Sequence, residues 1–271
     1  MRVLVVVLAL FALPAHALEL HGAFKQGGLV IGKSVPGAHV TLDGEAVDTA
    51  TDGAFVIGFG RDAKAKAVLK VTTPGGEAKE RIMAIAKQDY KIQRIDGLPA
   101  RKVTPKPEDV ARIKADNAKI WRVRASISDE ARFLTGFRWP VTGPISGVFG
   151  SQRILNGKPK SPHNGVDIAA PRGSTITAPC DGVVALVHRN MFYTGKTVMI
   201  DHGLGLTTVY AHMDDIFVVE GQVLKQGDPI GTVGKTGRVT GPHLHWGMTW
   251  KSVHLDPMLA TGAMAKVVSQ Q

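Results

Sequence analysis

The sequence predicts a mostly β protein in which two β domains are joined by a long helix. Short segments of alternating apolar and polar residues fill about residues 22–97 and again residues 137–260, separated by turns rich in glycine and aspartate. Such alternation is typical of strands that bury one face. Between the two stretches, apolar residues recur every three or four positions, which is the period of a helix. Because helices do not alternate with the strands, we expect antiparallel rather than parallel sheets.

The start of the chain has the pattern of a secretory signal peptide at residues 1–17. Met1-Arg2 precedes an apolar run from Val3 to Leu13, and Pro14-Ala15-His16-Ala17 supplies small residues for cleavage. The apolar run is too short to span a bilayer comfortably, so we prefer cleavage to a retained anchor. We expect cleavage after Ala17 and an exported mature chain, periplasmic or secreted, without a membrane span.

Residues 18–98 are predicted to form a small immunoglobulin-like β-sandwich. Strand-like runs with turns between them lie at residues 38–42, 55–59, 68–71, 82–85 and 90–95. Their spacing and the turn Thr51-Asp52-Gly53-Ala54-Phe55 resemble the immunoglobulin-like or carboxypeptidase-regulatory-like modules of secreted enzymes. A carbohydrate-binding role would need stacking aromatic side chains, yet this stretch has no Trp and only one Tyr, Tyr90. We therefore expect a spacer or a docking module for a protein partner.

Residues 99–136 are predicted to be a linker followed by an amphipathic helix. The prolines that mark the linker are Pro99, Pro105 and Pro107. The apolar positions at helical spacing are Val110, Ile113, Ile120, Ile127, Ala131 and Leu134. We expect one helix that ends near Gly136, with Glu108 and Asp109 in its first turn, where carboxylates suit the positive helix end. This helix either packs across the C-terminal domain, covers its site or binds a partner.

Composition sets broad bounds on the function. The chain has 271 residues, 44% of them hydrophobic, and a formal net charge of +10. This charge favours an anionic partner such as nucleic acid, an anionic membrane or an acidic polymer, although solubility also explains it. No arginine-rich run interleaved with aromatic residues occurs, so we do not expect nucleic-acid binding. The single cysteine, Cys180, precludes an intramolecular disulfide, and we expect it to be a small buried residue.

Residues 137–260 are predicted to form a compact antiparallel β-barrel or sandwich, followed by a C-terminal tail at residues 261–271. The expected strands are 182–187, 197–201, 207–211, 230–233 and 244–249. In the last strand, His243 and His245 share one face, while Leu244 and Trp246 point into the core.

Histidines in this domain gather in three segments that suit a metal site. The segments are His163-Asn164-Gly165-Val166-Asp167, Tyr210-Ala211-His212-Met213 and His243-Leu244-His245. An imidazole and a carboxylate four residues apart can converge on one ion, and one imidazole of the His-x-His pair would complete a shell of two histidines and one carboxylate. Three protein ligands and an open fourth position are what a hydrolytic zinc site needs. The remaining imidazoles are then available for proton transfer and charge stabilisation.

The three segments, in this order, resemble the LytM-type (M23, lysostaphin-like) zinc metallopeptidases. The similarity covers roughly Trp139 to Thr249 and includes the runs Gly165-Val166-Asp167-Ile168-Ala169-Ala170-Pro171 and Gly182-Val183-Val184. It implies a C-terminal domain of the LytM (duplicated hybrid motif) type. It also implies a zinc endopeptidase that hydrolyses the cross-linked stem peptides of bacterial peptidoglycan.

The resemblance also implies a role for each site residue. Residues matching His163, Asp167 and His245 hold zinc, and those matching His212 and His243 act on the bound water and the developing oxyanion. We expect His243 to be the general base and His212 to bind or protonate the tetrahedral intermediate. All five residues are present, whereas family members that only activate other cell-wall enzymes lack some of them.

Three alternative functions fit parts of the same pattern. The first is a non-catalytic regulator that binds peptidoglycan or activates a cell-wall hydrolase, which the complete ligand set disfavours. The second is a non-haem iron oxygenase, whose two histidines and one carboxylate do not account for His212 and His243. The third is a structural zinc site, which is normally closed by four ligands and rich in cysteine.

A few further residues carry lesser predictions. The polar segment Arg153 to Lys160 is predicted to be a loop, either solvated or lining a groove. His202 is expected to make a structural hydrogen bond. Tyr210 either orients the site or packs in the core. The remaining histidines that we expect at the surface are His39, His188 and His254.

Overall fold

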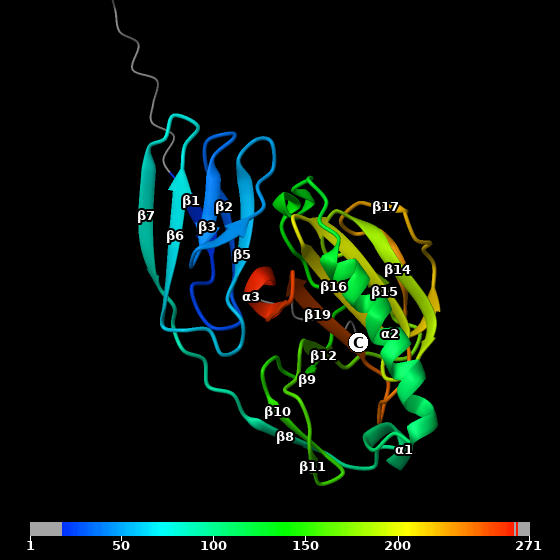
Figure 1. Cartoon of the computed structure of the whole chain (residues 1–271). Coiled ribbons are helices and arrows are strands. Elements are labelled where there is room, and N and C mark those ends of the chain that lie inside the picture. Colours follow the sequence, from blue (N-terminus) through cyan, green and yellow to red (C-terminus); the bar gives the residue numbers. More distant parts are fainter. Residues whose placement is uncertain (1–17, 263, 265–271) are drawn as a thin grey trace, which may run out of the picture.

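The computed structural model describes residues 18–262 and 264, so the predicted signal peptide and most of the C-terminal tail lie outside the described residues. The protein is mostly β, as predicted (Figure 1). Among the described residues, no helix is both long and apolar enough to cross a membrane.

The N-terminal region is a β-sandwich, as predicted. One sheet has the order β1 (Glu19–Gly22), β2 (Leu29–Lys33), β5 (Ala54–Gly58). The facing sheet has the order β4 (Glu45–Val47), β3 (His39–Leu42), β6 (Lys66–Thr72), β7 (Ala78–Ala84). Alternate apolar side chains from both sheets, among them Val30, Phe55 and Leu69, are fully buried between them. The buried side chains thus form the two-layer core that the alternating pattern predicts.

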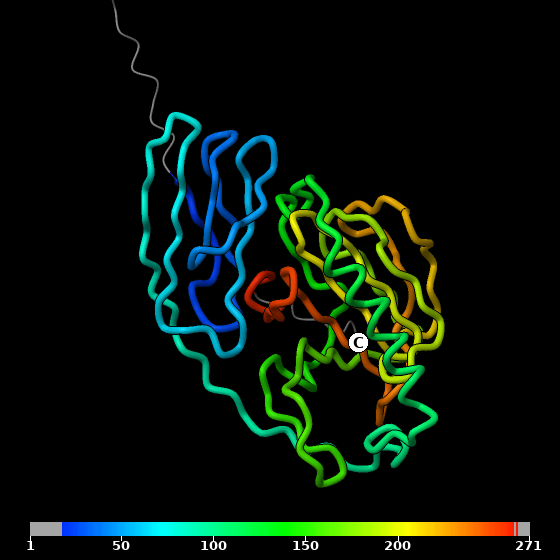
Figure 2. The backbone as a smooth tube through the Cα atoms, in the orientation of Figure 1, coloured from blue at the N-terminus to red at the C-terminus, as the bar shows by residue number. Residues whose placement is uncertain are grey.

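The strand predicted at residues 90–95 forms, but not in the sandwich. As β8 (Ile92–Ile95) it leaves the sandwich and pairs in parallel with β10 (Gln152–Leu155), which pairs in turn with β11 (Lys158–Pro159). Figure 2 shows the chain running from the sandwich to this small sheet. The side chains of β8 are exposed or half-buried, and that of Gln93 donates to the carbonyl of Ser146 at 3.1 Å.

The predicted helix is shorter than expected. After the short helix α1 (Ala100–Val103), α2 spans Pro107–Ala125, and a 3-10 turn, η1, covers Arg132–Thr135. The prediction that the helix ends near Gly136 was wrong. Beyond α2 the chain is held by other contacts. The hydroxyl of Ser128 donates to Asp201 at 2.7 Å, and the carbonyl of Ser128 accepts from the backbone N–H of Leu204 at 2.9 Å.

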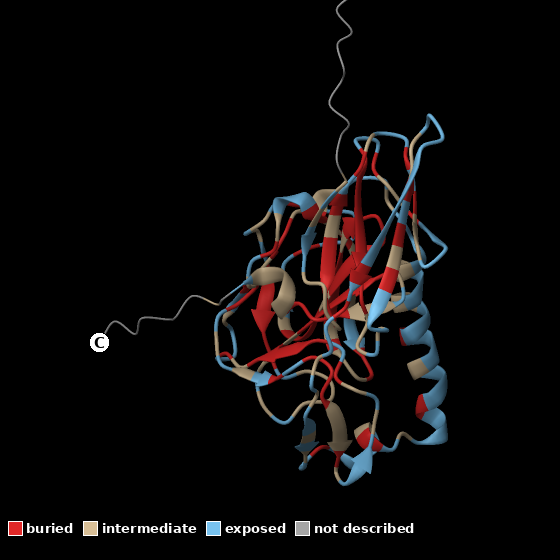
Figure 3. Ribbon diagram, turned by 90° about the vertical axis from the view of Figure 1, so that its left-hand side faces the viewer, coloured by how far each residue is buried: buried red, intermediate tan, exposed pale blue. Residues whose placement is uncertain are grey.

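Helix α2 packs on the C-terminal sheet through few apolar side chains. Ile120 and Val123 contact a small cluster on that sheet, but much of the helix is exposed (Figure 3). Glu108 and Asp109 lie in its first turn, as predicted, and Arg101 of α1 forms a two-pronged ion pair with Asp109. The predicted linker is therefore tied down along its length.

The C-terminal region is a large antiparallel sheet, which is not a closed barrel in the part of the chain described. The strand order is β17 (Val223–Leu224), β14 (Gly182–Met191), β15 (Gly195–Gly203), β16 (Leu206–Ile216), β19 (Leu244–Trp250), β12 (Val166–Ile168), β9 (Ile145–Gly147). The additional strands are β13 (Thr175–Thr177), β18 (Pro229–Val233) and β20 (Val253–Leu255), with the short helix α3 at Met258–Thr261. The central strands β16, β19 and β12 carry the candidate site.

The sandwich and the C-terminal sheet share one hydrophobic core. Leu255 of β20 packs on Gly58 of β5, and the backbone N–H of Asp256 donates to the carbonyl of Gly27 at 2.8 Å. On the same side, the ring of Tyr90 meets Phe149 edge to face, with ring centres 6.2 Å apart. The N-terminal sandwich therefore packs directly on the part of the chain that leads into the site.

Candidate metal centre

Side chains from three parts of the chain bring their donor atoms to one point. The Nε2 atom of His163 lies 3.1 Å from Oδ1 of Asp167 and 3.0 Å from Nδ1 of His245, and the latter atom lies 2.8 Å from the same carboxylate oxygen. In a tetrahedral zinc site with bonds of about 2.0–2.1 Å, two donor atoms lie roughly 3.3 Å apart. The spacing of these three atoms is thus close to one face of such a tetrahedron.

The sheet register sets two of these side chains opposite one another. Asp167 of β12 pairs directly with His245 of β19, so both side chains leave the same face. On its other edge, Asp167 pairs with Gly147 of β9. A side chain at Gly147 would collide with the Asp167 carboxylate in its present position, so glycine allows this close approach of β9 to the carboxylate.

His163 lies before β12 and is enclosed by the segment 148–151. Its backbone N–H donates to the carbonyl of Ser151 at 2.9 Å, and its own carbonyl accepts from Gly150 at 2.8 Å. Its ring nitrogen Nδ1 lies 3.1 Å from the carbonyl of Val148. Since a carbonyl can only accept, Nδ1 carries the proton and Nε2 presents its lone pair to the site.

The charges of these groups suit a cation. Burial lowers the pKa of His163 to about 4, partly opposed by the hydrogen bond to Asp167. Burial alone would raise the pKa of Asp167, but the adjacent rings of His163 and His245 outweigh it and hold that pKa well below its usual range. Two imidazole nitrogens 3.0 Å apart can share only one proton, whereas one ion satisfies both and the carboxylate. The two nitrogens and one oxygen suit zinc.

Arg153 binds the carboxylate of Asp167 through the oxygen that does not face the other ligands, Oδ2. Its guanidinium donates to Oδ2 of Asp167 at 2.5 Å, which leaves Oδ1 for the metal position, and its Nε donates to Gln93 of β8 at 3.3 Å. Partners that orient a ligating carboxylate in this way tune metal sites. The sequence marked Arg153 only as the start of a possible groove loop, because the strand pairing that brings it to Asp167 is not visible there.

His212 reaches the site because its strand bulges. Between Tyr210 and Met213 of β16, two residues oppose the single residue Thr197 of β15, and His212 has a positive φ of 64°. A bulge of this kind turns a side chain out of strict alternation. His212 therefore points into the site, while Tyr210, two residues earlier, is fully buried in the core.

The rings of His212 and His243 lie side by side with centres 4.9 Å apart. Nδ1 of His212 lies 2.8 Å from the carbonyl of Thr236, and Nδ1 of His243 lies 3.0 Å from that of Gly241. Both protons are thus fixed on Nδ1, and both Nε2 atoms carry a lone pair. Burial lowers the pKa of both rings, most strongly for His212, where the neighbouring histidines add to the effect. Both rings are neutral bases at neutral pH.

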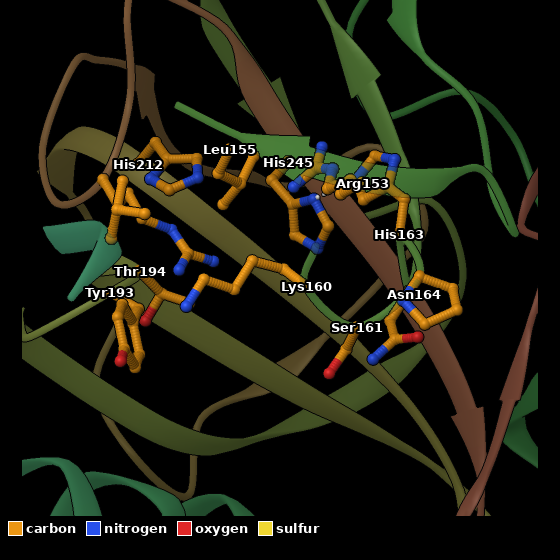
Figure 4. Close-up of a pocket in the computed structure, with 13 residues that line it drawn as sticks. Arg153, Leu155, Lys160, Ser161, His163, Asn164, Tyr193, Thr194, His212 and His245 are labelled. Carbon is orange, nitrogen blue, oxygen red and sulfur yellow. Dashed lines mark hydrogen bonds between the residues drawn. The ribbon is translucent and has the colours of Figure 1, made fainter. Parts of the chain in front are cut away.

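A cleft of about 390 Å³ is lined by His163, His212 and His245 (Figure 4). His163 and Asn164 lie at one side of it, and His212 lies with Tyr193 and Thr194 at the other. The hairpin formed by β10 and β11 supplies the wall that carries Arg153, Leu155 and Lys160, so the predicted polar segment lines a groove. Val103 of α1 also lines the cleft.

Beyond His245, a smaller cavity of about 220 Å³ lies between α2 and the sheet. It is lined by Trp121 and Arg124 of α2, and by His254. His254, predicted at the surface, is half-buried there, and burial, with a smaller effect of Arg124, lowers its pKa to about 4. The Nε atom of Arg124 is buried and has no hydrogen-bond partner among the described residues.

Several predictions about neighbouring residues are confirmed. Leu244 and Trp246 are fully buried core residues, and Cys180 is a buried free thiol. His202 makes structural hydrogen bonds of 2.7 Å with the carbonyl of Asp181 and the hydroxyl of Thr208. The structure thus brings together all five predicted site residues, and it adds Arg153 as a residue that the sequence did not indicate.

Comparison with known proteins agrees with this geometry. A family model described as Peptidase family M23 matches residues 161–257. A solved structure of a Pseudomonas aeruginosa protein assigned to the M23 peptidases aligns with a TM-score of 0.68 and 28% identity, covering 89% of this chain and 96% of that one.

Curated relatives match over part of their length. The chain is 39% identical over 137 residues to peptidoglycan DD-endopeptidase ShyA of Vibrio cholerae, which is 49% of this chain and 32% of that protein. It is 48% identical over 84 residues to DD-carboxypeptidase/endopeptidase Mpg of Neisseria meningitidis, which is 31% of this chain and 19% of that protein. The matches thus span between a fifth and a third of these relatives' length.

Proposed function

We propose that this chain, which carries a peptidase family M23 domain, is an exported zinc-dependent endopeptidase that hydrolyses the peptide cross-links of bacterial peptidoglycan. The observation that carries the proposal is the meeting of His163, Asp167 and His245 within 3.1 Å of one another, beside two neutral histidines. The relatives named as peptidoglycan DD-endopeptidases support the substrate class. The net charge of +10 suits an acidic wall polymer.

The metal would be held by Nε2 of His163, Oδ1 of Asp167 and Nδ1 of His245. When bound, zinc supplies the Lewis acidity that makes water nucleophilic near neutral pH and polarises a carbonyl. Arg153 keeps Asp167 oriented through its second oxygen. Because the ligands come from a loop and two paired strands, the sheet fixes their positions before any ion binds.

His243 and His212 would handle the protons of hydrolysis. The fixed proton on Nδ1 makes Nε2 of each ring an acceptor, so we assign His243 as the general base that takes a proton from the attacking water. His212 was expected to bind or protonate the tetrahedral intermediate, but its proton lies on Nδ1 against the carbonyl of Thr236, so we propose instead that its Nε2 accepts the second hydrogen bond of that water and keeps the water oriented. Once His243 has taken a proton at Nε2, it can donate a hydrogen bond to the developing oxyanion and then transfer that proton to the amine nitrogen as the C–N bond breaks. No covalent enzyme intermediate is required.

We further propose that residues 1–17 are removed on export and that the N-terminal sandwich is a spacer or a docking module for a protein partner. Peptidoglycan lies outside the cytoplasm, so the proposed substrate requires an extracytoplasmic location.

Digestion of purified cross-linked muropeptides by the chain from residue 18 tests the proposed activity. With zinc present, cross-linked dimers should disappear and monomers should accumulate. Chelator treatment should stop the digestion, and added zinc should restore it. Asp167→Asn is the matched inactive variant. If the zinc-loaded chain leaves dimers intact while Asp167→Asn behaves identically, the protein is not an endopeptidase of this kind, and the non-catalytic alternative gains weight.

A further inference from the structure

The guanidinium of Arg238 lines the cleft beside His212, and none of the described residues supplies it with an anionic partner. We propose that Arg238, together with Lys160, forms a subsite for a free carboxylate of the substrate, next to the scissile amide. This inference rests on the proposed function and adds to it, since it specifies that the preferred peptide carries an unamidated carboxylate near the bond that is cut.

The charge of the cleft supports an anionic ligand. Among the described residues that line the cleft of about 390 Å³, those with a formal charge are all basic: Arg153, Lys160 and Arg238. Arg153 is already paired with Asp167, which leaves Arg238 and Lys160 to act on a ligand. In Figure 4, Lys160 extends across the cleft toward Thr194 and Tyr193, at the side where His212 lies.

Arg238 is held in place, but its charge is not balanced. Its guanidinium stacks on the ring of Tyr193 at 4.5 Å, and NH1 donates a long hydrogen bond of 3.4 Å to the carbonyl of Lys102. Within residues 18–262 and 264, no carboxylate forms an ion pair with Arg238 or Lys160. Burial, and to a smaller extent the neighbouring Arg153, lowers the pKa of Arg238. Because burial disfavours the charged guanidinium, an anion supplied by the ligand would stabilise it.

The position of Arg238 relates the subsite to the chemistry. Arg238 and His212 both line the main cleft, and they also line a small adjoining cavity together with His243 and Asp167. A group bound by Arg238 is therefore close to the two proton-transfer histidines. The planar guanidinium can hold a carboxylate through two parallel hydrogen bonds, which a neutral carboxamide cannot accept in the same way.

The test compares two synthetic peptides of one sequence that contain one scissile amide. In the first, the residue next to that amide carries a free carboxylate, and in the second it carries a primary carboxamide. For the zinc-loaded wild type, we expect kcat/KM to favour the carboxylate by about tenfold or more, as a charge-assisted hydrogen bond implies. Arg238→Gln should bring the ratio close to one, and Arg238→Lys should retain part of it.

A matched control uses the same segment of chain. Lys235 is exposed and lies three residues before Arg238, outside the cleft lining, so Lys235→Gln removes one charge without touching the subsite. It should keep the full preference of the wild type. Lys160→Met should reduce the preference without abolishing it. Because each value is a ratio for one variant on two substrates, a general loss of stability or activity does not move it.

Binding gives a readout that does not need catalysis. We would titrate chelator-treated wild type and Arg238→Gln with both peptides by calorimetry, so that a metal ion cannot supply the preference. Tighter binding of the carboxylate by wild type but not by Arg238→Gln supports the subsite, even if neither peptide is cleaved and the proposed function fails. Equal affinity of the wild type for both peptides, or an unchanged preference in Arg238→Gln, overturns the subsite, whatever the cleavage assay gives.

Discussion

Arg61 of the N-terminal sandwich donates from Nε to the carbonyl of Gly150 at 2.7 Å, and so reaches the segment that encloses His163. Gly150 itself donates to His163, and its α-carbon lies so close to the ring of Tyr90 that a side chain there would collide with it. Arg61 and Tyr90 thus both contact Gly150, and through Gly150 they support His163, one of the proposed metal ligands.

Replacement of Arg61 should weaken this support of His163. For Arg61→Gln we expect a loss of about 1 kcal/mol in the free energy of unfolding, the usual worth of one hydrogen bond. We also expect zinc affinity to fall severalfold, because His163 becomes less well fixed. Competition with a chromogenic chelator measures the affinity. Lys64→Gln, an exposed charge change nearby, should leave affinity unchanged; equal effects of both variants would contradict the supporting role.

Zinc retention should distinguish the proposed metal ligands from the proposed general base. His163→Ala and Asp167→Ala should abolish zinc retention after dialysis. His243→Ala should retain zinc but lose about 10²- to 10⁴-fold in kcat, the usual share of a general base. Elemental analysis alongside the muropeptide digest checks both results. If His243→Ala also loses its zinc, His243 is a ligand and the division of the His-x-His pair is incorrect.

Arg153 should matter for metal affinity although it touches no metal position. For Arg153→Gln we expect zinc affinity to fall about 10- to 100-fold, as is typical when the partner of a ligand is removed. The control is Lys158→Gln on the same hairpin, whose amino group faces the hydroxyl of Thr104 instead. An Arg153→Gln variant with wild-type zinc affinity would show that Oδ2 of Asp167 needs no partner.

Gly147→Ala tests the close approach between β9 and β12. The added methyl group would collide with the carboxylate of Asp167, so either the strand or the carboxylate must move. We expect zinc to be lost at concentrations that saturate the wild type, with a lower unfolding temperature. Gly75→Ala, in an open turn, is the matched control and should behave as wild type. Normal zinc binding by Gly147→Ala would rule out this steric constraint.

His202 should make stability depend on pH. Burial lowers its folded pKa from 6.5 to about 4, so between these values the unfolded chain binds more protons than the folded one. Its contribution is therefore complete above about pH 6.5 and is lost as the pH falls toward 4, on the order of 3 kcal/mol in all. Denaturant titrations at pH 7 and 4.5 measure it. His202→Gln should be less stable at pH 7 but show a shallower pH dependence; an unchanged slope would exclude His202 as the source.

Much of the candidate site could be predicted from local sequence. The alternation around Leu244 and Trp246 places His243 and His245 on one face because strand geometry repeats every two residues. Alternation alone would send His212 to the core, and only the bulge opposite Thr197 returns it to the site. A bulge depends on how two strands pair, so no single segment encodes it.

Other features depended on contacts between distant residues. Arg153 reaches Asp167 through the β10–β11 hairpin, and the contact spans 14 residues of sequence with no periodic signature. The helical spacing of Ile127 and Leu134 predicted a longer helix, yet both side chains are exposed, and Ser128 binds Asp201 instead. In the second case tertiary contacts overrode a local helical pattern.

The parallel pairing of β8 with β10 bears on how such a protein can be rearranged by recombination. Gln93 supports Arg153 from β8, and Leu98 exchanges two hydrogen bonds with the side chain of Asn156 in the hairpin turn. A gene fusion that transferred only residues 137–260 would leave this hairpin without its neighbour. We therefore expect a chimera that inherits the chain from Ile92 onward to hold Arg153 and the hairpin better than one that begins at residue 137.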